Sequence, residues 1–130
     1  MVNAVTYILD NNSTVKNLVG LRAGATTDYK VFPVVVFESE KAPYIVVRQS
    51  GKVRLGKNCG YNYTIDVICY AGSYDEVNAL NDACVSALEG AAAATINGYA
   101  FSYLNVLNES DGEFIREHNL YSKVATFEGV

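Results

Sequence analysis

The sequence predicts an α+β domain in which helices cover one face of an antiparallel β-sheet. Residues 61–71 alternate between apolar and polar side chains, as in a strand with one buried face. Residues 73–90 repeat apolar side chains at helical spacing behind a capping sequence. Segments rich in β-branched and aromatic residues lie on both sides, so we expect two short helices, three strands, a main helix and two strands, in that order.

The two short helices are expected at the N-terminus. One apolar helical face of residues 2–9 consists of Val2, Val5, Ile8 and Leu9. Ser13 is placed to cap a second helix, which ends at Gly20. The side chains expected to point inward from this second helix are Val15, Leu18 and Val19.

Three strands are expected before the main helix. The first, 31–39, contains Pro33, which has no backbone donor and therefore favours a sheet edge or an irregular start. The second, 43–50, runs into a glycine-punctuated basic segment, 48–60. We interpret this segment as the tip of a long projecting hairpin that returns through 61–71. The glycines expected to permit its turns are Gly51, Gly56 and Gly60.

The main helix is expected to begin at a capping box formed by Ser73 and Glu76. Gly90 is expected to end it. Its buried stripe is predicted to consist of Val77, Leu80, Cys84, Ala87 and Leu88. This helix and the two short ones are expected to pack on the same face of the sheet.

A closing hairpin is expected from two strands, within 96–110 and 113–129, with the pair at 111–112, Asp-Gly, as its turn signal. Four acidic residues surround this predicted tip: Glu109, Asp111, Glu113 and Glu117. Their spacing does not match a calcium loop. They are interpreted either as solvated surface charge or as an acidic counter-patch for a basic partner.

The residues favour no catalytic or metal site. His118 is the only histidine, and a lone histidine on a predicted strand is seldom catalytic. The three cysteines, Cys59, Cys69 and Cys84, lack C-x-x-C spacing, which argues against zinc and against a disulfide framework. No nucleotide-binding motif is present. We therefore expect no enzyme, no cofactor and no metal.

Length and composition fit one domain, 1–130, because 50% of the residues are hydrophobic and 18% are charged. The first residues lack a basic region followed by an apolar run, so no signal peptide is expected. No segment approaches the ~20 apolar residues of a membrane span. We expect a soluble protein without a membrane partner.

The basic segment is unusual in a chain whose formal net charge is −4. Residues 41–65 carry five basic residues and no acidic one, which leaves five basic and fourteen acidic residues elsewhere. Four of the five bases fall within ten positions: Arg48, Lys52, Arg54 and Lys57. Three interpretations remain: a solvated loop, an arm that binds nucleic acid through its phosphates, and an arm that docks on an acidic surface of another copy.

Three pieces of the sequence resemble the phage tail completion or tail terminator family. Residues 43–47 read Pro-Tyr-Ile-Val-Val on a predicted strand, and residues 66–70 end the alternating strand. Residues 73–77, Ser-Tyr-Asp-Glu-Val, open the main helix. Together with the order of the elements, the resemblance covers nearly the whole chain.

The resemblance implies a structural virion protein at the tail–head junction, made in the cytoplasm of a bacterial host. Proteins of this family cap the tail tube as a ring, typically a hexamer, and join it to the head connector. The implied partners are further copies of the chain, the major tail tube protein, the head connector or stopper protein and, non-specifically, channel DNA. The four bases are then expected at a contact with a subunit, the tube or the connector. The alternatives are a nucleic-acid-binding accessory protein that uses the 48–60 hairpin, and a neighbouring head–tail connector or stopper protein.

Overall fold

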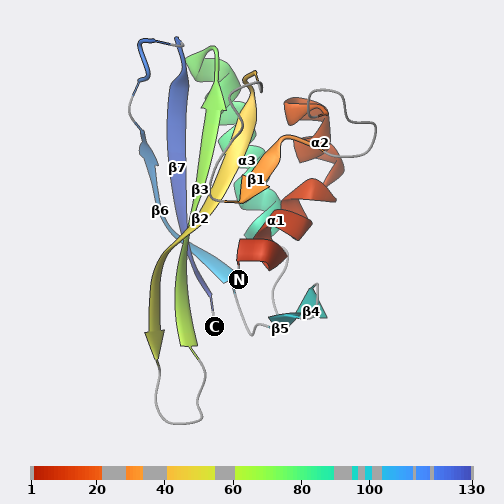
Figure 1. Cartoon of the computed structure of the whole chain (residues 1–130), viewed down its shortest axis with the longest axis vertical. Coiled ribbons are helices and arrows are strands. Elements are labelled where there is room, and N and C mark those ends of the chain that lie inside the picture. Colours follow the sequence, from red (N-terminus) through yellow and green to blue (C-terminus); the bar gives the residue numbers. More distant parts are fainter. Residues whose placement is uncertain are drawn as a thin grey trace.

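In the computed structural model, one five-stranded sheet carries the helices on one of its faces (Figure 1). The structure describes residues 2–21, 29–33, 41–54, 61–89, 95–96, 99–100, 104–112, 114–117 and 119–129. The helices are α1 (Val2–Asp10), α2 (Ser13–Val19) and α3 (Tyr74–Glu89). The strands are β1 (Val31–Pro33), β2 (Tyr44–Arg54), β3 (Tyr61–Ala71), β4 (Thr95–Ile96), β5 (Tyr99–Ala100), β6 (Leu104–Asp111) and β7 (Tyr121–Gly129).

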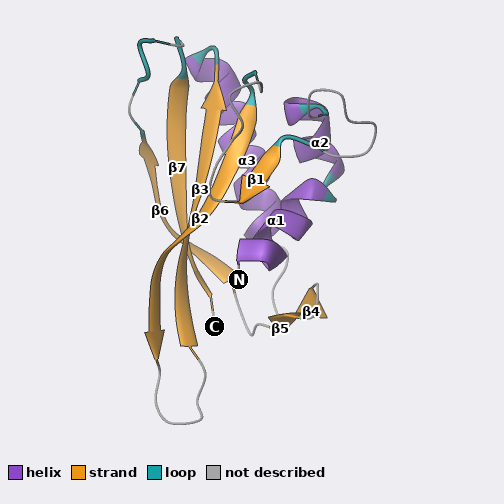
Figure 2. Ribbon diagram, viewed as in Figure 1, coloured by secondary structure: helices purple, strands orange, loops and turns teal. Residues whose placement is uncertain are grey.

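The main sheet has the strand order β1-β2-β3-β7-β6, and β4 pairs with β5 in a small sheet of its own. Helix and strand layers are separate (Figure 2), which confirms the predicted α+β class. Strand β1 lies at an edge, as Pro33 predicted, but it runs parallel to β2. The expectation of an entirely antiparallel sheet is therefore wrong at β1. Ten residues, 34–43, separate the two strands, so no tight turn forces an antiparallel pair.

The larger hydrophobic core lies between the sheet and the helices. Alternate residues of β3, Ile65, Val67 and Cys69, face it, as predicted from the period of two. Ile45 and Val47 of β2 face it as well. Helix α3 buries the predicted stripe of Val77, Leu80, Cys84 and Leu88, whereas Ala87 is only partly buried. Ser73 caps this helix, because its Oγ accepts a hydrogen bond from the backbone N–H of Glu76 at 3.2 Å. Gly90, which was predicted to end the helix, lies outside the described residues.

The two short helices form where they were predicted, with two corrections. The N-cap of α2 is Asn12 instead of Ser13, because the Asn12 side chain accepts from the backbone N–H groups of Thr14 and Val15, both at 3.1 Å. Leu18 is 39% exposed, so its predicted inward position is wrong. The buried face of α2 is narrow and consists of Val15 and Val19. These two residues lie four positions apart, directly above one another, which leaves Leu18 at the side.

A second, smaller hydrophobic cluster occupies the other face of the sheet. Residues that alternate with the main core form it: Phe32, Tyr44, Val46, Ile68 and Leu120. The rings of Tyr44 and Tyr70 lie 5.0 Å apart within it. Burial is the main cause that raises the pKa of both phenols, and the nearby Arg48 partly opposes the rise at Tyr70. Part of the sheet face that carries no helices is therefore hydrophobic, and its side chains are buried.

The closing hairpin forms from β6 and β7, but its turn lies beyond the predicted Asp-Gly pair. The N–H of Gly112 still donates to a β7 carbonyl at 2.9 Å. Ile115 and Leu120 then exchange two backbone hydrogen bonds, and Asn119 in the turn has a left-handed φ of 53°. Ile115 and Leu120 pack on the second cluster, which holds the hairpin closed past Gly112. The turn prediction at 111–112 is wrong for this reason, and the predicted strand 96–110 is described as a strand of the main sheet only from Leu104 onward.

Candidate functional site: a basic arm and an acidic end

The basic segment lies on a two-stranded arm of the sheet. Strand β1 pairs with β2 only as far as Val47, and the last residue of β3 that pairs with β7 is Tyr63, opposite Gly129. Beyond these points β2 and β3 continue together to Arg54 opposite Tyr61. Figure 1 shows this pair extending past the helices at one end of the long axis. We call these strands, together with the residues that join them to the sheet, the arm; it comprises residues 48–54 and 61–64.

The first part of the segment predicted as a hairpin tip, 48–54, belongs to strand β2. Gly51 lies in β2 beside Thr64 and is not a turn residue, so that prediction is wrong. The strand register shifts between Gln49 and Gly51, which makes Ser50 the extra residue of a β-bulge. The Ser50 hydroxyl donates to the carbonyl of Thr64 at 3.2 Å and ties the bulge to β3. Residues 55–60, with Gly56, Cys59 and Gly60, lie outside the described residues.

Arg48, the first of the four bases, is paired within the sheet. Its Nε lies 3.6 Å from Oδ2 of Asp66, which is the opposite residue on β3. The other carboxylate oxygen of Asp66 accepts from the hydroxyl of Thr126 at 2.9 Å. The Arg48 side chain is 58% exposed, but its charge is compensated at the base of the arm.

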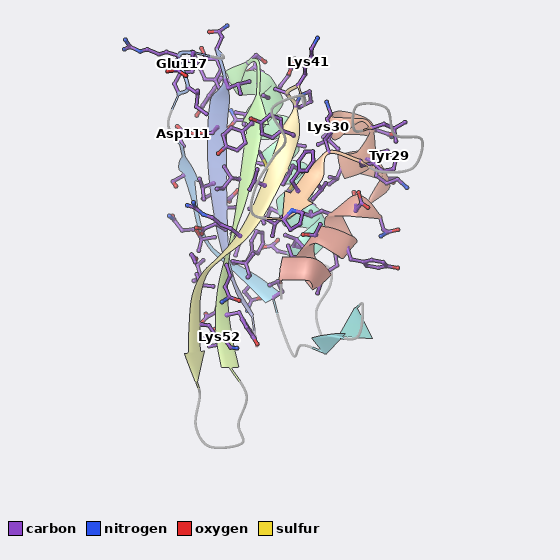
Figure 3. The ribbon with its side chains drawn as sticks, in the orientation of Figure 1. Tyr29, Lys30, Lys41, Lys52, Asp111 and Glu117 are labelled. Carbon is purple, nitrogen blue, oxygen red and sulfur yellow. The ribbon has the colours of Figure 1, made fainter. Side chains whose placement is uncertain are left out.

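Lys52 is exposed further along the arm (Figure 3). Its Nζ lies 5.5 Å from the centre of the Tyr63 ring on the paired strand. The structure describes only the backbone of Arg54, and Lys57 lies outside the described residues. Among the described positions, the predicted basic set is thus divided between Arg48, paired at the base, and Lys52 and Arg54, nearer the end of the arm.

Asp111 and Glu117, two of the four predicted acidic residues, lie at the end of the molecule opposite the arm (Figure 3). Figure 3 shows Asp111 and Glu117 at one end of the long axis and Lys52 at the other. The carboxylate of Glu109 accepts from the amide of the buried Asn81 on α3 at 2.6 Å. Both oxygens of Asp111 lie 3.1 Å from the hydroxyl of Tyr74, also on α3. Two of the acids therefore attach β6 to the main helix.

Of the other two predicted acids, Glu117 is exposed and Glu113 lies outside the described residues. Glu117 is exposed in the turn between β6 and β7. Glu113 and His118 lie outside the described residues. Of the four predicted acids, Glu109 and Asp111 have a structural role, and Glu117 is surface charge.

An exposed aromatic cluster lies beside the acids and was missed by the sequence analysis. It consists of Tyr74 on α3, Phe114 in the connection and Tyr121 on β7, which are 46%, 43% and 37% exposed. The rings of Phe114 and Tyr121 lie 4.8 Å apart, and those of Tyr74 and Tyr121 lie 6.2 Å apart. The three residues come from separate segments, so only the fold brings them together. The available signal was Tyr74 in the otherwise polar first turn of α3.

The described residues hold no obvious centre for metal or redox chemistry. No three His, Cys, Asp or Glu side chains gather there into a group that could hold a metal ion. Cys69 and Cys84 are free and buried, with sulfurs 3.8 Å apart. Their mutual hydrogen bond and their burial hold the pKa of Cys69 well above its ordinary value. Cys59 lies outside the description.

The surface hollows on α3 offer little chemistry. Two hollows, each of about 390 Å³, lie along this helix. Each contains one carboxylate from α3, Asp82 in the first and Glu76 in the second. Within the described part of the chain, no helix is both long and apolar enough to cross a membrane.

The fold resembles that of a chain in a solved virion structure. A chain from the structure titled "Virion of native gene transfer agent (GTA) particle" superposes with a TM-score of 0.75 at 14% sequence identity. The match covers 99% of this chain and 92% of that chain, so the fold is shared over nearly its full length. No curated protein sequence matches significantly.

The family model described as tail completion protein gp17 matches residues 3–127. This match makes the chain a structural protein of the virion tail. The chain therefore belongs to the tail completion protein gp17 family, and the resemblance identified from the sequence is confirmed.

Proposed function

We propose that this chain is the tail terminator or tail completion subunit that caps the tail tube and joins it to the head connector as a ring. Membership of the tail completion family supports the role in the tail. The partners would be further copies of the chain, in a hexamer, together with the major tail tube protein and the head connector or stopper protein. The four bases of the 48–60 hairpin would lie at one of these contacts.

The observation that carries the proposal is the difference between the two ends of the molecule. One end is a basic arm that extends past the helices (Figure 1), and the other end carries Asp111 and Glu117 (Figure 3). The exposed ring of Tyr74 is hydrogen-bonded to Asp111. A subunit with two different contact surfaces can bind its copies head to tail, and such contacts close into a ring when the rotation between copies permits. A ring on the end of a tube then has one surface for the tube and one for the head.

The test is electron microscopy of particles made without this protein. Tails should then lose their uniform length and lack heads, because nothing stops growth of the tube or presents a surface to the connector. Tails of normal length that carry heads would overturn the proposal. Supplying the wild-type chain from a plasmid should restore normal particles.

A second experiment isolates the arm. Replacing Arg48, Lys52, Arg54 and Lys57 together by Ser removes the basic charge of the segment. A control variant, Lys41→Ser with Arg116→Ser, removes two basic charges from exposed residues outside the arm. The arm variant should fail to restore infectious particles, whereas the control should succeed. Infectious particles with normal tails from the arm variant would rule out a role for the arm.

Binding of DNA by the arm makes a different prediction. If the arm bound DNA, a gel shift would be seen with bare DNA at low salt. That shift would weaken steeply as salt is added, because each phosphate contact adds to the salt dependence. Arg48 is already paired with Asp66, which reduces the charge available to phosphates. We expect no shift at low salt, and a strongly salt-dependent shift would favour the nucleic-acid alternative.

A further inference from the structure

We propose that the aromatic cluster Tyr74, Phe114 and Tyr121, together with Asp111, is the surface on which the basic arm of a neighbouring copy docks. This inference rests on the proposed ring and names the surface that each arm would contact. The occupant is the arm of a second copy, which carries the bases Lys52 and Arg54 and is followed in the sequence by Lys57.

The first argument is the composition and preorganisation of the cluster. Three large rings are each more than a third exposed. The centre of the Tyr121 ring lies 4.8 Å from that of Phe114 and 6.2 Å from that of Tyr74. Exposed groups of large aromatic side chains are typical of the energetic centres of protein interfaces. The hydroxyl of Tyr74 also donates to the carboxylate of Asp111, which fixes a negative charge beside the rings. A partner would therefore meet a surface that needs little reordering.

The second argument is that this chemistry fits a cation. A carboxylate attracts Lys or Arg, and the face of a tyrosine or phenylalanine ring attracts the same groups through its quadrupole. The fold already contains such pairs, because Lys52 lies over Tyr63 and Lys16 lies 5.0 Å from the centre of the Tyr29 ring. The segment 41–65 has five bases and no acid, so the arm has the complementary charge.

The third argument is that one chain cannot make this contact with itself. Asp111 and Lys52 lie at opposite ends of the long axis (Figure 3). Arm and cluster can therefore meet only between copies, and the contact joins two different surfaces. Repetition of such a head-to-tail contact is what closes a ring.

The experiment uses two full-length variants that together keep one arm and one cluster. The acceptor variant carries Lys52→Glu, Arg54→Glu and Lys57→Glu, so its cluster is intact but its arm is reversed. The donor variant carries Asp111→Asn and Tyr121→Ser, so its arm is intact but its cluster is disrupted. Isotope-labelled acceptor is titrated with unlabelled donor, and the amide signals of the acceptor are followed by NMR.

The expected result is a saturable shift of signals at Tyr74, Phe114 and Tyr121 and a complex that stops at one donor and one acceptor. Phe114→Ala in the acceptor should weaken binding about tenfold, as for an interface aromatic of this kind. Tyr7→Ala is the matched control, because Tyr7 is 48% exposed on α1, outside the cluster. It should leave the affinity unchanged.

A donor concentration of about 1 mM is high enough to detect even weak binding. If no signal of the cluster shifts up to that concentration, the inference is overturned. Shifts confined to another surface would overturn it as well. Circular dichroism confirms that each variant is folded before titration, and a donor whose arm is also reversed should give no shift. Tail length and head attachment are measured separately. Capped tails that form without this contact would reject the inference and leave the proposed function standing. The contact without capped tails would reject the proposed function.

Discussion

The acidic end and the basic arm hold their charges in different ways. At the acidic end, Glu109 and Asp111 accept hydrogen bonds from Asn81 and Tyr74, so these carboxylates help to attach β6 to α3. On the arm, Arg48 pairs with the carboxylate of Asp66, and the Lys52 side chain lies over the Tyr63 ring of the same hairpin. A cluster of like charges in a sequence can therefore have a structural role, an interaction role or both. The following predictions separate these roles.

The largest effect is expected from Glu109→Ala. This change leaves the amide of Asn81, which is fully buried, without its acceptor, and an unsatisfied buried polar group costs about 1–3 kcal/mol. Urea denaturation should measure a loss of this size in the free energy of unfolding. Glu117→Ala removes the same charge from an exposed turn and should change stability by less than about 0.5 kcal/mol. Equal effects of the two substitutions would show that the hydrogen bond to Asn81 is unimportant.

The sequence predicted the regular parts of this fold because periodicity reports which side of an element is buried. The stripe of α3 and the alternation of β3 both follow directly from that rule. The predictions failed where a local signal competed with tertiary packing. The pair at 111–112 has the composition of a tight turn, but apolar contacts of Ile115 and Leu120 extend the hairpin beyond it.

The candidate site could be predicted only in part, for a related reason. The excess of bases at 48–60 and of acids near 109–117 is visible in the sequence. That the two groups lie at opposite ends depends on the twist and order of the strands, which composition does not encode. The aromatic cluster combines Tyr74 with Phe114 and Tyr121, forty or more positions further along the chain. Only the packing of α3 against the β6–β7 hairpin brings them together.

A smaller effect is expected where the arm joins the body, at the pair of Arg48 and Asp66. Arg48 is largely exposed, so the coupling energy between the two residues should be about 0.2–1 kcal/mol. A double-mutant cycle of Arg48→Ala and Asp66→Asn measures it, because the amide oxygen that the second substitution introduces can still accept from Thr126. Added salt should reduce the coupling. A coupling of zero at low salt would mean that Arg48 belongs functionally with the rest of the arm.

A further effect is confined to high pH and concerns Tyr44 and Tyr70, on the sheet face without helices. Burial raises the pKa of both phenols above the ordinary value of 10.0, so their neutral forms favour the folded state. This contribution is fully present below pH 10 and is lost as pH rises through the higher folded pKa. The double variant Tyr44→Phe and Tyr70→Phe should therefore lose less stability between neutral and alkaline pH than the wild type. Tyr7→Phe, at an exposed position, is the control, and an unchanged alkaline loss in the double variant would contradict the prediction.

The smallest effect on the free energy of unfolding is expected from Lys52→Ser. This substitution should nevertheless reduce particle assembly. The substitution removes an exposed charge and a contact with Tyr63 that is worth about 0.5–1 kcal/mol at most. Thermal unfolding should therefore change little, while head-joined particles made in a complementation assay should decrease. Glu109→Ala should show the reverse order, with a clear loss of stability that precedes any loss of particles. If Lys52→Ser destabilises the fold as much as Glu109→Ala does, the arm is part of the stable body, and its charge cannot be assigned to docking.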